Sequence, residues 1–270
     1  MTASTQTIPE TTIHAETRGS TLLIRMDGPE TRNAITGPNF GRMRALLADA
    51  SRNPALRAVV ITGDNGYFSS GGNLRRLKKT AEGPYSEASS NTDLLSAMIL
   101  GIRDCPLPVI AAVEGGAVGV ATSLALACDM IVAASDVSFT VAYVRIGLTP
   151  DGGVTHFLSA ALPRQIVSEL CLTGAPITAE RLATAGLVNR VVDKGTALDT
   201  ALDLAKRFDK APRTAVSVIK SELNAAPRNS LAEQLALEAQ NLNHARYQPE
   251  GREGIAAFLE KRKPEFPSNE

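Results

Sequence analysis

The sequence predicts an α/β fold with parallel strand pairing, on three observations. Between residues 56 and 134, short apolar runs alternate with amphipathic helical patterns, which is typical of strand–helix–strand units. Several turns that lead from a strand into a helix are rich in glycine. After residue 160 the patterns become almost wholly helical. Because ligands of such folds bind beyond the carboxyl ends of the strands, we expect the functional site at these turns.

Hydrophobic periodicity predicts the individual elements. Strands are predicted where residues alternate or form a short apolar run, at 20–27, 56–63, 108–115 and 129–134. Helices are predicted where apolar residues recur on one face, at 37–50, 91–105 and 118–127. Pro38 stands in the first turn of the first of these helices, where proline is tolerated.

The chain divides into three predicted regions. Residues 1–15 are polar and are expected to form a flexible tail, 16–200 a ligand-binding core, and 201–270 a helical region. Ser230 and Glu233 have the spacing of a capping box, which predicts a helix start within the last region. From this architecture we expect the helical region to pack against a neighbouring subunit.

Composition excludes several classes of protein. Lysine plus arginine (28) balance aspartate plus glutamate (28), so no net charge favours nucleic acid or an anionic membrane. Tryptophan is absent and aromatic residues make up 4%, which disfavours a base-stacking surface. We see neither a secretory signal nor an apolar run of about 18 residues. The three scattered cysteines have no metal-ligand spacing, and we expect a cytoplasmic protein without a metal site.

Three glycine-rich turns are the candidate sites for chemistry: "GDNGYFSSGGNL" (63–74), "VEGGAVGVATS" (113–123) and "GLTPDGG" (147–153). Glycines let a backbone approach a ligand closely and leave N–H groups free to donate. The alternative is that each is only a tight turn. None contains the dinucleotide, P-loop or nucleophile-elbow fingerprint, so those activities are not predicted.

Taken together, the motifs resemble a known family. "RNAIT" (32–36), "FSSGGNL" (68–74), "VIAAVEGGAVGVATSLALACD" (109–129), "LTGAPITAERLATAGLVNRVV" (172–192) and "AAFLEKRKPEF" (256–266) occur in this order. The set resembles the crotonase, or enoyl-CoA hydratase/isomerase, superfamily over nearly the whole chain after the tail. The resemblance implies a spiral of ββα units with a C-terminal helical region that forms a homotrimer or a dimer of trimers.

The resemblance also implies a site for an acyl-CoA substrate, with no further cofactor. In this family two backbone N–H groups form an oxyanion hole for the thioester oxygen, and the matching positions are Gly72 and Val120. Val120 stands in the opening turn of a predicted helix, where N–H groups lack internal partners and the dipole favours anions. The implied CoA-binding residues are Arg32, Ala34, Ser70, Gly71, Gly72, Asn73, Leu74, Phe258 and Lys261, the last two often contributed by a neighbouring subunit.

The two glutamates that the family's hydratases use are missing. Their motif positions are occupied by Ser123 and Tyr143. Ser123 is interpreted as a small polar wall residue, and Tyr143 as a packed aromatic or a hydrogen-bond donor into the pocket. Asp151 is the acid left among the pocket positions, where some family members carry their working carboxylate. It is predicted to be the general base; the alternative is a helix N-cap before residues 152–160.

Several functions remain open at this point. An enoyl-CoA isomerase would move a double bond with Asp151 as proton carrier, and opening of an epoxide-type aryl-CoA is a variant of it. A hydratase would use Asp151 with one ordered water, whereas a hydrolase or substitution enzyme would form a covalent intermediate at Asp151. A protein of another class would be a catalytically decayed acyl-CoA-binding scaffold.

Overall fold

A computed structural model describes residues 9–266. Its main sheet has six strands in the order β1-β2-β3-β4-β6-β9: β1 (Thr12–Arg18), β2 (Thr21–Asp27), β3 (Ala58–Gly63), β4 (Val109–Val113), β6 (Met130–Ala134) and β9 (Arg190–Val192). β1 and β2 are antiparallel, and every other neighbouring pair is parallel. A three-stranded sheet joins β5 (Ala117–Val118), β7 (Ser138–Thr140) and β8 (Pro176–Thr178).

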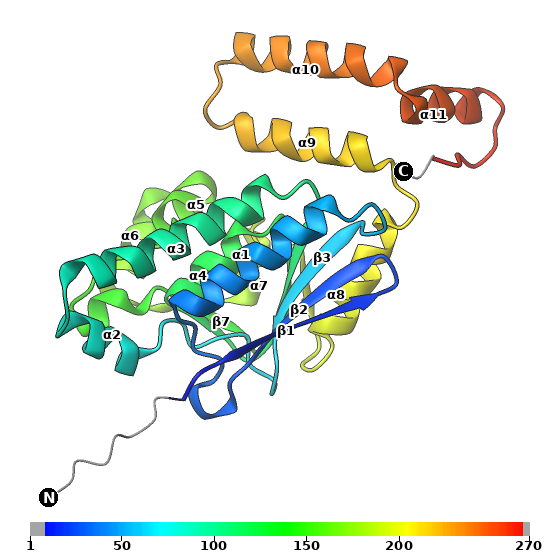
Figure 1. The fold of residues 1–270 in the computed structure, drawn as a ribbon. Helices are drawn as coiled ribbons and strands as arrows, with labels where there is room; N and C mark the ends of the chain where they lie inside the picture. The colour runs from blue at the N-terminus through cyan, green and yellow to red at the C-terminus, as the bar shows by residue number, and fades with distance from the viewer. Residues whose placement is uncertain (1–8, 267–270) are drawn as a thin grey trace, which may run out of the picture.

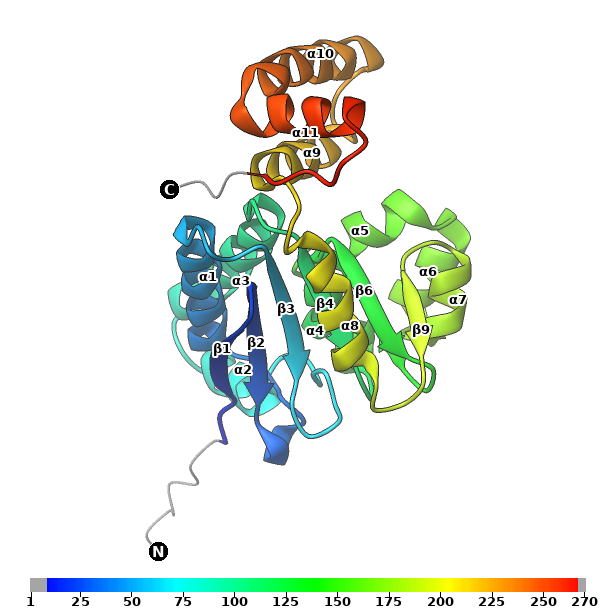
Figure 2. The same ribbon diagram turned by 90° about the vertical axis from the view of Figure 1, so that its right-hand side faces the viewer.

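Helices cover both faces of the main sheet (Figure 2). One face packs on α1 (Gly37–Arg52), α3 (Tyr85–Asp104) and α4 (Val120–Ala127), and the other on α8 (Ala197–Ala205). Successive side chains of a strand point to opposite faces; accordingly Val59 and Ile61 join the first cluster, whereas Val60 joins the second. Because both faces are covered, the inner strands read as continuous apolar runs.

Shorter elements complete the body. They include the helices α2 (Leu74–Ala81), α5 (Val154–Ala161), α6 (Arg164–Thr173) and α7 (Ala179–Thr184), and the 3₁₀ helices η1 (Pro29–Thr31), η2 (Ala142–Ile146) and η3 (Lys206–Phe208). No helix among residues 9–266 is long and apolar enough to span a membrane.

Three further helices, α9 (Arg213–Ala225), α10 (Leu231–Tyr247) and α11 (Pro249–Leu259), extend away from the body (Figure 1). Lys220 of α9 anchors them: its buried ammonium lies 2.7 Å from an oxygen of Asp129 and donates to the carbonyl of Leu107 at 3.0 Å. The buried carboxylate of Glu250 accepts the N–H of Thr214 at 3.1 Å. Both buried charges thus keep partners, and removal of one partner would leave an uncompensated buried charge.

Most predicted elements are confirmed. The four predicted strands are β2, β3, β4 and β6, and the three predicted helices are α1, α3 and α4. The capping box at Ser230 is also present, with Glu233 accepting the Ser230 N–H at 2.7 Å.

Three predictions are corrected. Residues 12–15 belong to β1 rather than to a tail, because they pair with β2; residues 1–8 of the predicted tail lie outside the described residues. α3 begins at Tyr85, before the apolar periodicity that predicted it. The region after 160 contains two strands, β8 and β9, each three residues long and therefore too short to show an alternation.

Candidate active site

The loop that carries Gly72 is tied to the segment before α1. The N–H of Ile35 donates to the Gly71 carbonyl at 2.7 Å, and the N–H of Asn73 donates to the Ile35 carbonyl at 3.2 Å. These two bonds engage the carbonyl of Gly71 and the N–H of Asn73, the residues on either side of Gly72. Among residues 9–266 the Gly72 N–H has no hydrogen-bond acceptor, so it remains available to a ligand.

The second predicted donor lies on the adjoining segment. Val120 is the first residue of α4, where its N–H has no intrahelical acceptor, and the described part of the chain supplies no other. The two segments run side by side, since the Val118 N–H donates to the Ser69 carbonyl at 3.1 Å. A Cβ at Gly71 would collide with the Val118 carbonyl and lie 3.6 Å from the Val120 nitrogen. With a φ of +92°, Gly71 suits glycine on backbone grounds as well.

Asn33 organises the loops that are predicted to hold CoA. Its buried amide accepts the Gly28 N–H at 2.8 Å and donates to the carbonyls of Asp64 and Tyr67 at 2.9 and 2.6 Å. Asn33 adopts a left-handed conformation with a φ of 59°. Sequence reasoning quoted the motif around Asn33 but did not single this residue out; an asparagine at a strand-to-helix turn is the signal that could have found it.

The structure brings most predicted CoA-binding residues together around these loops. The Ser70 N–H donates to the Arg32 carbonyl at 2.9 Å, which places 32–34 against 70–72. Asn73 caps α2 by accepting the N–H of Arg75 at 3.1 Å, and Leu74 opens that helix with its side chain exposed. Ala34 is buried beneath them, so its contribution to a ligand surface is confined to the backbone.

Phe258 and Lys261 are not brought to this place within one chain. Phe258 lies on α11 with 84% of its surface exposed, and Lys261 follows that helix. Both views show α11 well separated from α2, which begins directly after the Gly72 loop (Figures 1 and 2). Within one chain these two residues therefore lie away from the Gly72 loop.

Asp151 is bonded to two side chains that stand at the motif positions of the missing glutamates. The Tyr143 hydroxyl donates to Asp151 Oδ1 at 2.7 Å. The Ser123 hydroxyl, on α4, donates to the Asp151 backbone carbonyl at 3.0 Å. The alternative of an N-cap is wrong, because α5 begins at Val154, its N-cap is Gly153, and no side chain caps it.

Tyr143 lies between the Asp151 carboxylate and the start of α4, where the second donor is predicted. A Cβ at Gly119, the N-cap of α4, would lie 3.9 Å from the ring carbon that bears the Tyr143 hydroxyl. The aromatic ring therefore lies next to the residue that precedes Val120, while its hydroxyl contacts Asp151. The hydroxyl end of Tyr143 thus lies between the predicted base and the residue that precedes the second predicted donor.

Burial shapes the electrostatics of this pair. Desolvation raises the pKa of Asp151, and the hydrogen bond from Tyr143 lowers it in part. Desolvation, followed by the negative charge of Asp151 and the hydrogen bond to it, raises the pKa of Tyr143 far above its ordinary value. The phenol therefore keeps its proton throughout the physiological range, and Asp151 is the member of the pair that can accept one.

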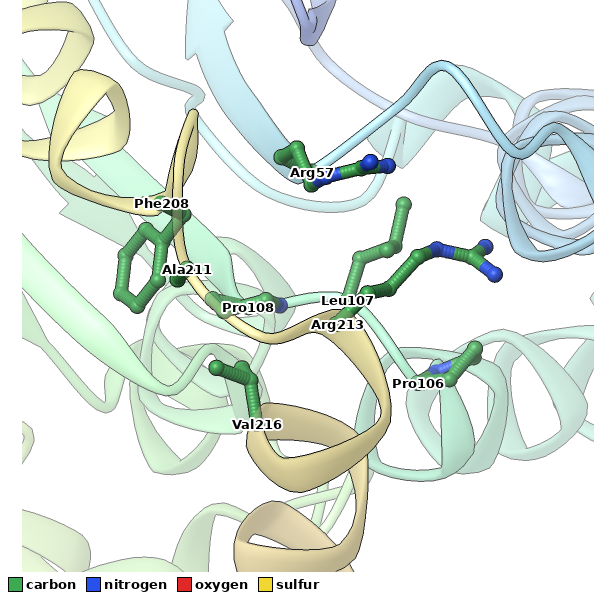
Figure 3. Close-up of a pocket in the computed structure, with 8 residues that line it drawn as sticks. All are labelled: Arg57, Pro106, Leu107, Pro108, Phe208, Ala211, Arg213 and Val216. Atoms are coloured by element: carbon green, nitrogen blue, oxygen red, sulfur yellow. The ribbon is translucent and has the colours of Figure 1, made fainter. Parts of the chain in front are cut away.

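A separate shallow depression lies at the junction with the helical region (Figure 3). It lies between Arg57 and Arg213 and is otherwise lined by apolar residues, including Leu107 and Phe208. Arg213 donates to the Ser51 carbonyl at 2.8 Å, at the end of α1, so it acts as a packing contact. No predicted site residue lines this pocket. Residues 9–266 contain no group of three His, Cys, Asp or Glu side chains that could hold a metal ion.

Comparison with known proteins identifies the family. Residues 16–269 match the family model described as enoyl-CoA hydratase/isomerase. The chain belongs to the enoyl-CoA hydratase/isomerase family, within the crotonase superfamily. A crystal structure of an enoyl-CoA hydratase from Polaromonas sp. JS666 is 41% identical, with a TM-score of 0.93 over 94% of this chain and 99% of that one.

Two curated relatives carry different activities in their names. A 1,2-epoxyphenylacetyl-CoA isomerase of Escherichia coli is 30% identical, over 91% of this chain and 94% of its own. A probable enoyl-CoA hydratase of Rhodobacter capsulatus is 35% identical, over 94% of this chain and 97% of its own. The protein is therefore an enzyme of a family that acts on acyl-CoA thioesters, and its relatives include both reaction types.

Proposed function

We propose that this enzyme is an enoyl-CoA isomerase that shifts a double bond, with Asp151 as the proton carrier. The observation that carries the proposal is the pairing at this site: one carboxylate, that of Asp151, accepts a hydrogen bond from a protonated phenol, and a serine hydroxyl binds the backbone carbonyl of the same residue. Hydration by the family's two-glutamate route needs two carboxylates at the positions of Ser123 and Tyr143. Neither side chain can act as one.

The proposed reaction begins with a β,γ-unsaturated thioester whose carbonyl oxygen accepts the N–H groups of Gly72 and Val120. Asp151 removes a proton from the α-carbon, and the C–H electrons form a double bond between the carbonyl carbon and the α-carbon while the carbonyl π electrons move to the thioester oxygen, which gives a dienolate. When the oxygen returns these electrons to the carbonyl, the α,β double bond forms and the electrons of the β,γ double bond take the proton back from Asp151 at the γ-carbon. The negative charge of the dienolate develops on the thioester oxygen, and losing one oxyanion donor typically costs about 3 kcal/mol of transition-state stabilisation.

The raised pKa of Asp151 supports this role. A general base works best when its pKa lies near the pH of the reaction, and burial moves Asp151 in that direction. The same carboxylate then becomes a competent acid when it returns the proton. His156 is exposed on α5 and has no part in this mechanism.

A second candidate is hydration with Asp151 and one ordered water, which relatives named as hydratases favour. The isomerase variant that opens an epoxide on an aryl-CoA is favoured by the relative of that name. A catalytically decayed scaffold is disfavoured, since a decayed site has no need of a half-buried carboxylate with a dedicated hydrogen-bond donor.

The experiment that tests the proposal is a panel of acyl-CoA thioesters with identification of each product. It would contain β,γ- and α,β-enoyl-CoA esters of matched chain length, an epoxide-type aryl-CoA and a saturated ester. Conversion of the β,γ-enoyl ester to its conjugated isomer is expected. Formation of a 3-hydroxyacyl product as the main outcome would favour hydration, and release of free CoA would favour hydrolysis.

A further inference from the structure

Tyr143 fills a place in the site that the proposed proton transfer does not itself require. Its ring packs against the main hydrophobic core, and its hydroxyl turns to Asp151 Oδ1 at 2.7 Å. A ring held for packing alone would be served equally by phenylalanine. The hydroxyl is therefore the part of Tyr143 that calls for an explanation.

Within residues 9–266 this hydroxyl is the one side-chain hydrogen-bond donor to the Asp151 carboxylate. Ser123, from α4, binds the backbone carbonyl of Asp151 and leaves the carboxylate alone. Leu95 from α3 and Phe157 from α5 pack against the glycines that follow Asp151, and both are apolar. No lysine, arginine or histidine of the described residues forms an ion pair with Asp151. The backbone N–H of Asp151 itself is the other donor to its carboxylate.

We propose that Tyr143 is a positioning residue for Asp151, whose phenol holds Oδ1 so that the carboxylate presents one fixed face to the substrate. This inference rests on the proposed function of Asp151 as the base. A short side chain within a glycine-rich turn can occupy several staggered χ1 rotamers unless a neighbour restrains it. A rigid partner with the phenol proton always in place supplies that restraint, because the base must lie within hydrogen-bond reach of the proton it removes.

The phenol has a second consequence, which a purely structural role would not have. Burial raises the pKa of Asp151, and the donated hydrogen bond lowers it. Removing the hydroxyl leaves burial unopposed by that bond, so the pKa of Asp151 rises further. Because the carboxylate must be ionised to act as a base, the acid limb of the pH–rate profile moves to higher pH.

The test compares Tyr143→Phe with the native enzyme on the β,γ-enoyl-CoA ester over the full pH range. We expect the acid limb of kcat/KM to move up by about one pH unit. We expect kcat at its plateau to fall about 10- to 100-fold with KM little changed, the size of effect that a misplaced catalytic group produces. Tyr247→Phe is the matched control, since Tyr247 lies exposed on α10, and its profile should equal that of the native enzyme.

Ser123→Ala separates positioning through the backbone from action on the carboxylate. It removes the bond to the Asp151 carbonyl but keeps the phenol on Oδ1, so it should lower kcat with a smaller shift of the acid limb than Tyr143→Phe. Replacement of the four tyrosines by 3-fluorotyrosine makes the phenol a stronger donor, and should move the limb in the opposite direction to Tyr143→Phe. This second measurement keeps the test available if Tyr143→Phe folds poorly.

A direct titration distinguishes failure of this inference from failure of the proposed function. The carboxyl of Asp151 can be followed by NMR in protein labelled with ¹³C-aspartate, with Asp151→Asn to identify its signal, and no turnover is needed. A higher pKa in Tyr143→Phe than in native protein is expected, whichever thioester proves to be the substrate. An unchanged Asp151 titration, or an unmoved acid limb in a folded and active Tyr143→Phe enzyme, would overturn the role given to Tyr143.

Discussion

The Tyr143 hydroxyl donates to Asp151 Oδ1 across 2.7 Å, and both residues stand on the rim of a buried α/β core. Tyr143 belongs to η2 and Asp151 to the glycine-rich turn before α5, so two short segments meet to form the pair. Within this pair the phenol of Tyr143 keeps its proton, whereas the carboxylate of Asp151 can exchange one.

Asp151 should lower the stability of the fold at pH values where its carboxylate is ionised. Burial raises its pKa above the value in the unfolded chain, about 3.9. The folded state therefore binds the proton more tightly, and the stability that this residue contributes decreases as pH rises from the unfolded to the folded pKa. Asp151→Asn should consequently melt at the same or a higher temperature than native protein at pH 7.5, and the difference should shrink towards pH 4. A variant that is less stable at pH 7.5 than at pH 4, relative to native protein, would contradict the sign of the shift.

Glutamates placed at positions 123 and 143 should introduce hydratase activity. The double variant Ser123→Glu/Tyr143→Glu places carboxylates at the positions that hydratases of this family use, and should hydrate α,β-enoyl-CoA faster than the native enzyme. The matched control is Ser123→Gln/Tyr143→Gln, which has nearly the same volume and no charge. Circular dichroism and CoA binding would establish that both variants fold, since Ser123 is fully buried. Equal hydration rates in two folded variants would show that carboxylates at these positions are insufficient.

Asn33→Ala should loosen the loops that carry the Gly72 donor. The substitution leaves the Gly28 N–H and the carbonyls of Asp64 and Tyr67 without the amide that now satisfies them. We expect the free energy of unfolding to fall by about 2–4 kcal/mol, measured by urea titration. Asn65→Ala is a matched control, because Asn65 has a nearly equal φ of 61°, against 59° for Asn33, but is exposed. Equal losses in the two variants would assign the effect to backbone strain.

The elements of the fold that have a clear hydrophobic periodicity of their own could be predicted from the sequence. β3 and β4 are apolar runs that end in glycine-rich turns, and α1 has a regular apolar face, so each could be read from its own residues. β1 could not, because its residues become a strand only by pairing with β2. The three-residue strands β8 and β9 exist for the same reason, as partners of β7 and β6.

Part of the candidate site could likewise be predicted from the sequence, and part could not. The position of Asp151 after Pro150 and before two glycines marked it as unusual, and family motifs pointed to Gly72 and Val120. The bond from Tyr143 to Asp151 depends on how η2 and the turn before α5 fold onto each other, and eight residues of sequence separation do not determine that. The structural role of Asn33 depends likewise on carbonyls more than thirty residues away.

The nucleotide end of the site should need more than one copy of the chain. Helices α9–α11 expose many large apolar side chains, among them Leu223, Leu235, Leu242 and Phe258. We therefore expect a homotrimer or a dimer of trimers, and a stable monomer in sedimentation velocity at micromolar concentration would contradict it. Lys261→Ala should weaken binding of CoA in the assembled protein, measured by calorimetry. Lys263→Ala is the neighbouring control, since Lys263 is also exposed, and unchanged affinity in Lys261→Ala would remove that residue from the site.

The central claim, that Asp151 carries the proton of a double-bond shift, is tested most directly in deuterated water. Native enzyme and Asp151→Asn are each incubated with β,γ- and α,β-enoyl-CoA, and product identity and label position are followed by mass spectrometry and NMR. Native enzyme should interconvert the two esters, with label restricted to the α- and γ-carbons. Asp151→Asn should be slower by about 10²–10⁴-fold, with thioester affinity nearly unchanged. Rapid hydration of the α,β ester by native enzyme, undiminished in Asp151→Asn, would contradict both the isomerase proposal and the role of Asp151.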